Sequence, residues 1–384
     1  MINLFDLDLL LFELILLVLF GLSLLIQIFY YFFFYGRLAY YKSSHSSAYK
    51  KPVSIIICAK DEANNLKKYL PSILSQDYPE YEVIVVNDCS EDETEQVLKN
   101  LKKKYKHLKI STIKKDKKFG HGKKFALFIG IKTAKNEWLL LTDADCYAET
   151  NQWLFTMQKS FKKNNSFVLG YGGYEKGKGI LNQVIRYDTV FIAMQYFGFA
   201  LTGIPYMGVG RNLAYRRSLF FESRGFSTHM HLNSGDDDLF INANANKTNT
   251  LIEVGEKSHI RSVPKKSFSE WAKQKRRHLT TSAYYRNKHK LLLIIEPFSR
   301  IIFYTTLILL LIQWIFPLVV IGTFLFRTII QLTFFKFAMV RLNEKKILLS
   351  SFIFDLLAPF YNLVFHLSEK FFRPEQKKWQ QINT

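Results

Sequence analysis

Two aspartates one residue apart, Asp143 and Asp145, are the side chains of this 384-residue sequence best suited to chemistry. They follow directly on a short apolar run, 138–142, so their carboxylates can share one hard divalent cation. Mg²⁺ typically takes one or two carboxylates and completes its shell with substrate phosphates. A metal bound in this way neutralises the charge that develops on a departing diphosphate. The pair therefore predicts a site for Mg²⁺ or Mn²⁺ and a nucleoside diphosphate, although Asp-x-Asp alone is a weak signal.

Acidic residues also follow two other apolar runs. Asp61 and Glu62 come after 53–58, and Asp88 comes after 82–86. Each has a simpler interpretation, because Asp and Ser are also good helix caps. Three acidic strand ends that meet on one rim of a sheet are harder to explain in that way. We therefore interpret them together as one binding site.

The elements that position these acids are predicted to be strands alternating with helices. The runs 53–58, 82–86, 108–113 and 138–142 are short and apolar, as in strands buried on both faces. Stretches with the helical period lie between them. This alternation predicts an open, mostly parallel α/β sheet with flanking helices. In such sheets ligands bind beyond the carboxyl ends of the strands, which is where the acids lie.

Both ends of the sequence are strongly apolar. Residues 14–35 form a run long enough to cross a bilayer, and 298–315 and 318–340 predict two more such helices. Lys and Arg follow the first run and none precedes it, which by the positive-inside rule places the chain after residue 36 in the cytoplasm. A further stretch, 347–367, could span, re-enter or lie in the interface. The tail after it is basic, with Lys370, Arg373, Lys377 and Lys378. This favours a non-spanning or hairpin segment.

These segments divide the chain into three expected parts. Residues 1–36 form an N-terminal transmembrane anchor, 37–296 a cytoplasmic domain, and 297–384 C-terminal membrane helices with a basic tail. Within the middle part, residues 180–207 mix apolar and polar side chains. That mixture fits either an amphipathic helix in the membrane interface or a buried core helix. Residues 267–296 are expected to return the chain to the membrane.

Charge and cysteine content narrow the functional class. The formal net charge is +21, and residues 99–124 hold twelve lysines against one acid, Asp116. The basic stretch can be a solvated face, attract anionic lipid headgroups, or bind nucleic acid. A nucleic-acid partner is not expected, because no nucleic-acid fold signature accompanies it. The cysteines Cys58, Cys89 and Cys146 show no paired spacing, so neither a disulfide framework nor a zinc site is expected.

Taken in order, the motifs resemble those of glycosyltransferase family 2, particularly its membrane-integrated branch of hyaluronan, chitin and cellulose synthases and ceramide glucosyltransferase. The resemblance extends over residues 51–285, with a similar placement of membrane helices. Several motifs are loose individually, but their order and spacing are specific. They are Ala59-Lys-Asp-Glu62, Val86-Asn-Asp-Cys-Ser-Glu-Asp92, Gly122-Lys-Lys-Phe-Ala-Leu-Phe-Ile-Gly130, Thr142-Asp-Ala-Asp145, Gly208-Val-Gly-Arg-Asn-Leu-Ala-Tyr-Arg216, Gly235-Asp-Asp-Asp238 and Gln274-Lys-Arg-Arg-His278.

The resemblance implies a GT-A-like fold and a role for each matching residue. Asp237 would deprotonate the acceptor hydroxyl, in a direct displacement that inverts the anomeric carbon. The other implied roles are nucleotide-sugar binding by Asp61, Glu62, Asp88, Lys123 and Asp143, metal binding by Asp143 and Asp145, and contacts to the diphosphate and acceptor by Asn212, Gln274, Arg276, Arg277 and His278.

Two departures from the family pattern bear on these roles. Asp236 stands where the family has glutamate, so the base can be Asp236 or Asp237; we favour Asp237, whose charged neighbours, Asp236 and Asp238, can raise its pKa. His278 stands where the family usually has tryptophan, which is an apolar platform near the acceptor sugar. This puts long-chain synthesis in doubt, although His278 can also be an ordinary surface residue.

The sequence thus predicts an integral membrane glycosyltransferase of a bacterial inner membrane, with a cytoplasmic catalytic domain. It would move a sugar from a nucleotide-sugar donor, UDP-linked by resemblance only, to a lipid-linked or saccharide acceptor. Single transfer is favoured over the alternative, a processive polysaccharide synthase. Two other classes are an inactive family member that serves as a membrane scaffold and a basic nucleic-acid-binding membrane protein. The joint presence of Asp143, Asp145, Arg277 and the aspartates 236–238 speaks against the scaffold.

Overall fold

The computed structural model describes residues 4–42, 50–114, 122–232 and 234–369; the predicted basic tail (Lys370, Arg373, Lys377, Lys378) and Asp116 lie outside these ranges. Its centre is a seven-stranded sheet with the order β3-β2-β1-β4-β8-β6-β9. β1 is parallel to β2 and β4, whereas β8 is antiparallel to β4 and β6. The predicted mostly parallel sheet with flanking helices is confirmed. The strands are β1 Val53–Ala59, β2 Tyr81–Asp88, β3 Leu108–Ile113, β4 Trp138–Leu141, β6 Phe167–Gly170, β8 Leu213–Arg216 and β9 Thr250–Glu253.

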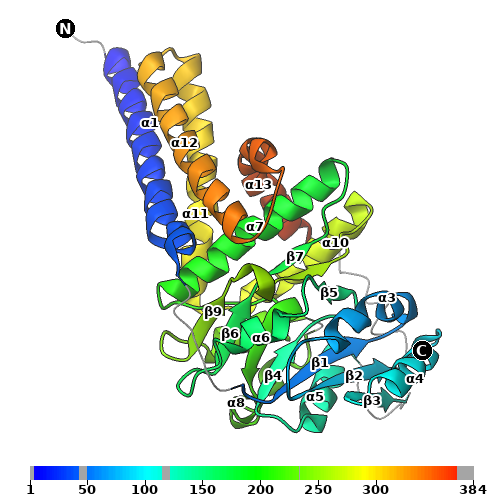
Figure 1. Cartoon of the computed structure of the whole chain (residues 1–384). Helices are drawn as coiled ribbons and strands as arrows, with labels where there is room; N and C mark the ends of the chain where they lie inside the picture. The colour runs from blue at the N-terminus through cyan, green and yellow to red at the C-terminus, as the bar shows by residue number, and fades with distance from the viewer. Residues whose placement is uncertain (1–3, 43–49, 115–121, 233, 370–384) are drawn as a thin grey trace.

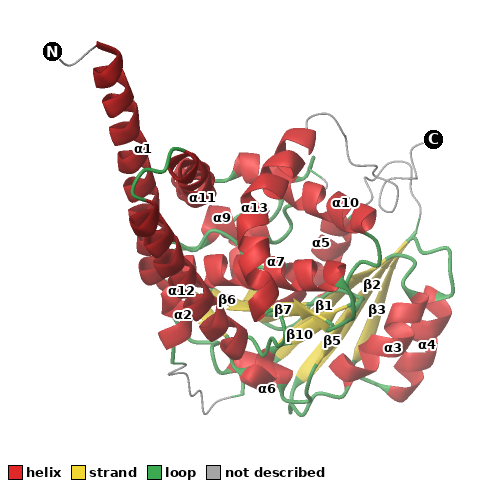
Figure 2. Ribbon diagram, turned by 90° about the horizontal axis from the view of Figure 1, so that it is seen from above, coloured by secondary structure: helices red, strands yellow, loops and turns green. Residues whose placement is uncertain are grey.

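β1 is apolar except for Ser54, because its side chains alternate between two cores. Ile55 and Ile57 pack with residues of α3 (Ala63–Leu74) and α4 (Thr94–Lys104), whereas Ile56 packs with α5 (Lys123–Thr133). Gly130 of α5 lies so close to the sheet that a Cβ there would come within 2.6 Å of Ile56 Cγ2. Figure 2 shows α3 and α4 on one side of the sheet and α5 on the other. The continuous apolar runs of the sequence therefore reflect burial on both faces.

A second, three-stranded sheet lies beside the first. Its strands are β5 (Cys146–Ala148), β7 (Gly172–Tyr174) and β10 (Ile260–Ser262), with β10 in the centre. β10 is antiparallel to β5 and parallel to β7. Because β5 begins directly after Asp145, this sheet borders the acidic motif. The remaining short helices of the domain are α6 Trp153–Gln158, α8 Arg217–Glu222, α9 Asp238–Asn244 and α10 Phe268–Leu279.

Four of the described helices are long and apolar enough to cross a membrane: Leu10–Tyr40, Asn287–Ile312, Pro317–Arg341 and Leu348–Ser368. The first consists of α1 (Leu4–Phe29), a π-helical turn (Tyr30–Tyr35) and α2 (Gly36–Tyr40). The others are α11 (Asn287–Ile312), α12 (Pro317–Arg341) and α13 (Leu348–Glu369). α1, α11 and α12 stand side by side above the α/β domain (Figure 1). α13 packs against α11 and α12 but also against α7 and α10.

α11 begins eleven residues before the predicted start at 298, so the expected boundary between 296 and 297 falls inside this helix. The predicted domain ended at Glu296 because the apolar block of the sequence begins at about Phe298. In the structure Glu296 is buried and bonded to Arg300 of the same helix, at 2.9 Å between Oε1 and Nε, so its charge does not interrupt the helix.

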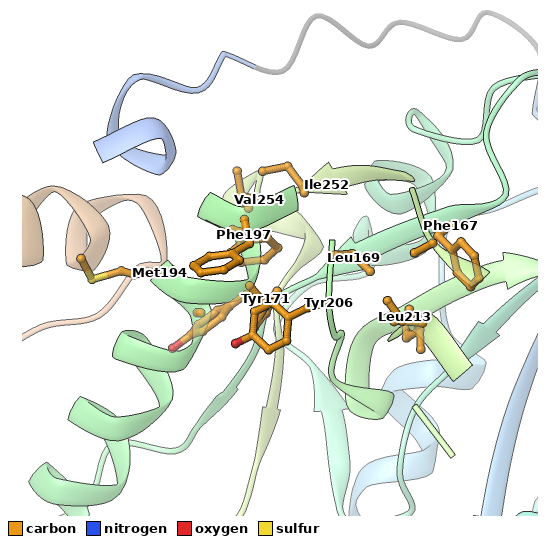
Figure 3. Close-up of a cluster of buried hydrophobic side chains, with 14 of the residues drawn as sticks. Phe167, Leu169, Tyr171, Met194, Phe197, Tyr206, Leu213, Ile252 and Val254 are labelled. Atoms are coloured by element: carbon orange, nitrogen blue, oxygen red, sulfur yellow. The ribbon is translucent and has the colours of Figure 1, made fainter. Parts of the chain in front are cut away.

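α7 (Ile180–Leu201) joins the two parts of the molecule. One side packs on β7 and β9 of the α/β domain, and another packs on the π-helical turn, α2, α12 and α13. Figure 3 shows Met194 and Phe197 of this helix with Leu169, Ile252 and Val254, which come from β6 and the region of β9. A Cβ at Gly198 would come within 2.5 Å of the carbonyl oxygen of Phe34. Of the two interpretations of 180–207, the structure favours the buried helix.

We call the four helices that are long and apolar enough to cross a membrane the membrane-type helices. A buried polar network connects them to one another. Asp355 of α13 accepts hydrogen bonds from Arg300 of α11 (3.1 Å), from Arg327 of α12 and from the hydroxyl of Tyr304 (2.9 Å). Arg327 Nε also donates to the side-chain oxygen of Gln27 in α1, at 2.8 Å. All four helices thus share one network, and its buried charges are paired, as they must be in an apolar setting.

The described lysines of the lysine-rich stretch up to Lys109 lie at the opposite end of the molecule from this bundle. Lys99 and Lys102–Lys104 belong to α4, and Lys109 belongs to β3. Figure 1 shows α4 and β3, the edge strand of the sheet, at the lower edge of the α/β domain, with α1, α11 and α12 above this domain. This placement favours a solvated face over attraction to lipid headgroups at the bundle.

Candidate active site

The structure brings together three charged side chains from distant parts of the chain. Lys123 Nζ lies 3.0 Å from Asp143 Oδ1 and 3.2 Å from Asp236 Oδ2. Lys123 is the first residue of α5, Asp143 follows β4, and Asp236 precedes α9. Burial alone would lower the pKa of Lys123, but Asp143, Asp236 and Asp237 outweigh it and raise this pKa well above its usual value. The lysine is therefore a permanent cation between the predicted metal-binding and base-bearing segments.

Lys124, the next residue, holds the segment that leads to the three aspartates. Its ammonium donates hydrogen bonds to the backbone carbonyls of His229 and Leu232, the second at 3.0 Å. Gly235, which follows, has a φ of +98°, a backbone conformation that favours glycine. These features fix the direction in which Asp236–Asp238 enter the site.

Asp143, Asp145 and Cys146 each place one possible ligand atom within 4.8 Å of the other two. The backbone N–H of Cys146 donates to the carbonyl of Asp143 at 3.1 Å, which turns the chain so that both carboxylates face the same space. The pKa of Asp145 is raised by burial and by Asp143. A divalent cation would relieve this crowding, and carboxylate oxygens suit Mg²⁺ and Mn²⁺. Burial raises the pKa of the Cys146 thiol well above its usual value, so this thiol is not suited to bind a hard cation.

Arg211 is a site residue to which the sequence analysis assigned no role. Its guanidinium lies 4.4 Å from the ring centre of Tyr174, and its Nη2 donates to the carbonyl of Gly172 at 2.9 Å. Burial alone would lower the pKa of Arg211. The nearby Tyr174, Cys146, Asp143 and Asp145 outweigh burial and raise this pKa above its usual value. The cation therefore lies within electrostatic reach of the Asp143–Asp145 pair. An arginine fork in that place suits a diphosphate.

The three consecutive aspartates have different surroundings. Asp236 pairs with Lys123; burial raises the Asp236 pKa, but Lys123 outweighs burial and the pKa is lowered. Asp238 accepts hydrogen bonds from Tyr285 (2.7 Å), from Thr281 and from the N–H of Leu239, so its carboxylate is committed to the protein.

Asp237 lies between these two and is the N-cap of α9. It accepts the N–H of Asp238 at 2.8 Å and the N–H of Gly210 at 2.7 Å. Burial, Asp236 and Asp238 raise the pKa of Asp237 to about 7. A carboxylate with a pKa near 7 can accept a proton at neutral pH and is a better base than one held low by an ion pair. Among the three, Asp237 is electrostatically best suited to take a proton.

The residues predicted to bind the nucleotide occupy the loops after β1 and β2. Asp61 is exposed and accepts the N–H of Glu91 at 2.8 Å, while Glu62 accepts the side-chain amide of Asn65. Asp88 is completely buried at the end of β2. Asp61 and Cys89 both have a φ of +53°. At position 89 a cysteine adopts the left-handed backbone conformation that favours glycine, and such strain is typical of functional loops.

The predicted acceptor-side residues divide into two groups: Gln274, Arg276, Arg277 and His278 lie on α10, whereas Asn212 lies directly before β8. Gln274 of α10 donates to the Tyr174 hydroxyl at 3.1 Å, which connects it to the ring beneath Arg211. Arg276 is partly buried, and Arg277 and His278 are exposed at the end of the same helix. α10 is held in place by the ion pair between Lys275 and Asp188 of α7, at 2.6 Å.

Asn212 has a different setting from the one predicted. Its side chain is completely buried; its oxygen accepts the indole N–H of Trp153 (3.1 Å), and its amide donates to the carbonyls of Tyr171 (2.9 Å) and Ser258 (2.8 Å). A direct contact with an acceptor would break these bonds. The geometry favours a role in positioning Arg211, its neighbour in the chain.

Comparison with known proteins is consistent with this arrangement. Residues 54–223 match the family model of Glycosyl transferase family 2. Over 158 residues the chain is 31% identical to a poly-β-1,6-N-acetyl-D-glucosamine synthase of Staphylococcus epidermidis, covering 40% of this chain and 36% of the relative. Over 178 residues it is 29% identical to a dolichyl N-acetyl-α-D-glucosaminyl phosphate 3-β-D-2,3-diacetamido-2,3-dideoxy-β-D-glucuronosyltransferase of Methanococcus voltae, covering 44% and 50%. The matched region thus spans between about a third and a half of these relatives.

The fold as a whole is similar to a solved structure. A mannosyltransferase of Pyrobaculum calidifontis, in complex with GDP-mannose and Mn²⁺, superposes with a TM-score of 0.57 at 16% identity, covering 86% of this chain and 98% of that one. The predicted GT-A-like sheet with additional membrane-type helices is thereby confirmed. In sequence, residues 54–223 of this chain are thus similar to glycosyl transferase family 2, and the likeness to the mannosyltransferase shows the fold.

Proposed function

We propose that the protein transfers a sugar from a nucleotide-sugar donor to an acceptor hydroxyl, with inversion and with help from a divalent metal. The observation that carries the proposal is the cluster in which Lys123 bridges Asp143 and Asp236. It places the acidic pair suited to a metal–diphosphate and the aspartate run suited to proton removal on either side of one lysine. Such an arrangement is what a displacement between a diphosphate and a hydroxyl requires.

Asp143 and Asp145 would hold the metal, which supplies charge neutralisation for the departing diphosphate. Lys123 and Arg211 add two cations next to the same acids, and Arg211 is oriented by the Tyr174 ring and Gly172. Asp237 takes the proton of the acceptor hydroxyl as its oxygen attacks the anomeric carbon and the bond to the diphosphate breaks. The loops that carry Asp61 and Asp88 would bind the nucleoside.

UDP-N-acetylglucosamine is the donor to test first. The relative of S. epidermidis is named for a polymer of N-acetylglucosamine. The same relative supports a processive synthase as the second candidate. His278, exposed at the end of α10, still favours transfer of a single sugar to a lipid-linked or saccharide acceptor.

We further propose that the α/β domain lies in the cytoplasm, at the inner membrane of a bacterium. Four of the described helices are long and apolar enough to cross a membrane; Arg37 lies in the last turn of the first of them, and Lys42, Lys50 and Lys51 follow it. Limited proteolysis of intact cells and of inverted vesicles tests this placement. Cleavage of residues 52–286 is expected only in inverted vesicles, and cleavage in intact cells would reverse the topology.

The activity is tested by nucleotide release from UDP-, GDP- and TDP-sugars, using purified protein with Mg²⁺ or Mn²⁺, with and without membrane lipid extract as acceptor. Metal-dependent release from one donor is expected. Asp145→Asn serves as the inactive control. Failure to release any nucleotide, together with failure to bind UDP or GDP, would favour the scaffold.

A further inference from the structure

The loop between α12 and α13 inserts a buried carboxylate into the α/β domain. Glu344, whose side chain is 1% exposed, accepts hydrogen bonds from Arg186 Nε at 2.9 Å, from the Tyr171 hydroxyl at 3.1 Å and from Arg261 Nη1. The two arginines also donate to backbone carbonyls of the loop: Arg186 to Lys345 and Arg261 to Asn343. The loop is thus held by α7 and by β10 together.

Arg261 connects this loop to the acidic motif through a single strand. It occupies the middle of β10, opposite Tyr147 of β5 and Gly173 of β7. β5 begins directly after Asp145, and Arg261 Nε also pairs with Glu149, just beyond β5, at 3.1 Å. A displacement of Arg261 would therefore move the strand that follows the proposed metal-binding residues.

The opposite neighbour, β7, carries the groups that orient Arg211. The carbonyl of Gly172 accepts a hydrogen bond from the guanidinium of Arg211, and the ring of Tyr174 lies beneath that guanidinium. β7 lies tightly against Arg261, because a Cβ at Gly173 would come within 2.2 Å of Arg261 Nη1. The middle strand of the small sheet thus contacts both the acidic side and the cationic side of the donor site.

Tyr171 provides a second connection. Its hydroxyl donates to Glu344, while its carbonyl accepts the side-chain amide of Asn212, the residue after Arg211. Figure 3 shows its ring packed close to α7, near Met194 and Phe197, so the ring has little freedom to move independently of that helix. Arg186 lies on the same helix and, like Tyr171 and Arg261, donates to Glu344. The connection through Arg261 and the connection through Tyr171 therefore share this one carboxylate.

We propose that Glu344 is a positioning residue that couples the membrane-type helices α12 and α13 to the donor side of the active site. Its carboxylate fixes Arg261 and Tyr171, and these fix the strand after Asp145 and the segment that bears Arg211. Without it, Arg186 and Arg261 are left with one carboxylate, Glu149, which is partly exposed and contacts only Arg261. Two buried cations would then repel each other next to the small sheet.

The chain offers a closely matched control. Asp355 is also buried, and it too is held by two arginines, Arg300 and Arg327, and one tyrosine hydroxyl, that of Tyr304. It lies among α11, α12 and α13, away from β5, β7 and β10. Glu344→Gln and Asp355→Asn therefore remove the same kind of group, with a similar expected loss of stability, from two different places.

Both variants of the full chain are compared with wild type in two assays. Hydrogen exchange is followed at residues 146–148, 172–174 and 260–262, and the binding of UDP and of GDP is titrated in the presence of Mn²⁺. Glu344→Gln is expected to speed exchange in all three strands and to weaken nucleotide binding about tenfold, a typical size for coupling between sites. Asp355→Asn is expected to leave both measurements close to wild type.

Unchanged exchange and affinity in Glu344→Gln, or equal changes in the two variants, would overturn the coupling. If Glu344→Gln does not fold, Glu344→Asp replaces it, since the shorter carboxylate keeps the charge but cannot reach both arginines; the same changes are then expected, at smaller size. The affinity arm rests on the proposed function, whereas the exchange arm does not. Wild-type protein that binds neither nucleotide would count against the proposed function, and the exchange data would still decide the role of Glu344.

Discussion

Replacing Asp237 by asparagine should abolish sugar transfer and, at the same time, stabilise the ligand-free protein at alkaline pH. Transfer is lost because the amide cannot accept the acceptor proton. Stability rises because the carboxylate is unfavourable where it is: burial and its neighbours Asp236 and Asp238 raise its pKa from 3.8 to about 7. An asparagine has the same shape and no charge.

The size and sign of the effect follow from the pKa difference. A shift of about 3 units corresponds to about 4 kcal/mol. The folded state of the wild type binds more protons than the unfolded state between about pH 4 and pH 7, so its stability falls as pH rises through this window and levels off above it. The variant lacks this fall. It does lose the charge-assisted bond from the Gly210 N–H, which offsets about 1–3 kcal/mol.

We therefore expect Asp237→Asn to be about 1–3 kcal/mol more stable than wild type at pH 8, and no more stable at pH 4.5. Thermal unfolding in detergent, without nucleotide or metal, gives the difference across this range, and nucleotide release gives the activity. The matched control is Asp236→Asn, which loses the ion pair with Lys123 and should be less stable than wild type at pH 8. A stability difference that does not change with pH would refute the raised pKa, and surviving transfer would refute Asp237 as the base.

Three further outcomes are expected. Asp145→Asn should lose metal-dependent nucleotide release and Mn²⁺ binding while remaining folded, because the residue lies on the rim of the sheet; wild-type release would contradict the metal assignment. Arg211→Lys keeps the charge but loses the fork and the stacking on Tyr174, so the donor KM should rise about tenfold, and an unchanged KM would exclude contact with the diphosphate. Gly198→Ala should destabilise the protein by about 1–3 kcal/mol, because its Cβ would meet the Phe34 carbonyl at 2.5 Å, with little change in activity per folded molecule; undiminished stability would show that α7 can move away from the first membrane-type helix.

The main sheet could be predicted from the sequence because its strands are buried on both faces. Residues such as Ile55 and Ile56 face different cores, so the strand has no polar side and reads as a continuous apolar run. The acids at the strand ends could be predicted for the same reason, because each acid follows closely on such an apolar run. Lys123 was found through its motif, and the structure shows its ammonium between Asp143 and Asp236.

The small sheet could not be predicted in the same way. β5, β7 and β10 have three residues each, too few to show a period of two, and their partners are far apart in the chain. The role of Arg211 depends on this sheet, because Gly172 and Tyr174 aim its side chain. The motif placed Arg211 beside Asn212 but gave no information about which of the two faces the acids and which is buried.

The bond between Gln27 and Arg327 has a consequence for how the protein is made. The two residues are separated by 300 positions, so the helix that contains Gln27 leaves the ribosome long before its partner exists. At about 5–20 residues per second, roughly 15–60 s pass between them. During that interval, in the proposed membrane placement, the first helix has a polar side chain that has yet to meet its arginine, while the whole α/β domain is synthesised. The last helices then complete the bundle, so assembly of this protein ends where it began, at its first membrane segment.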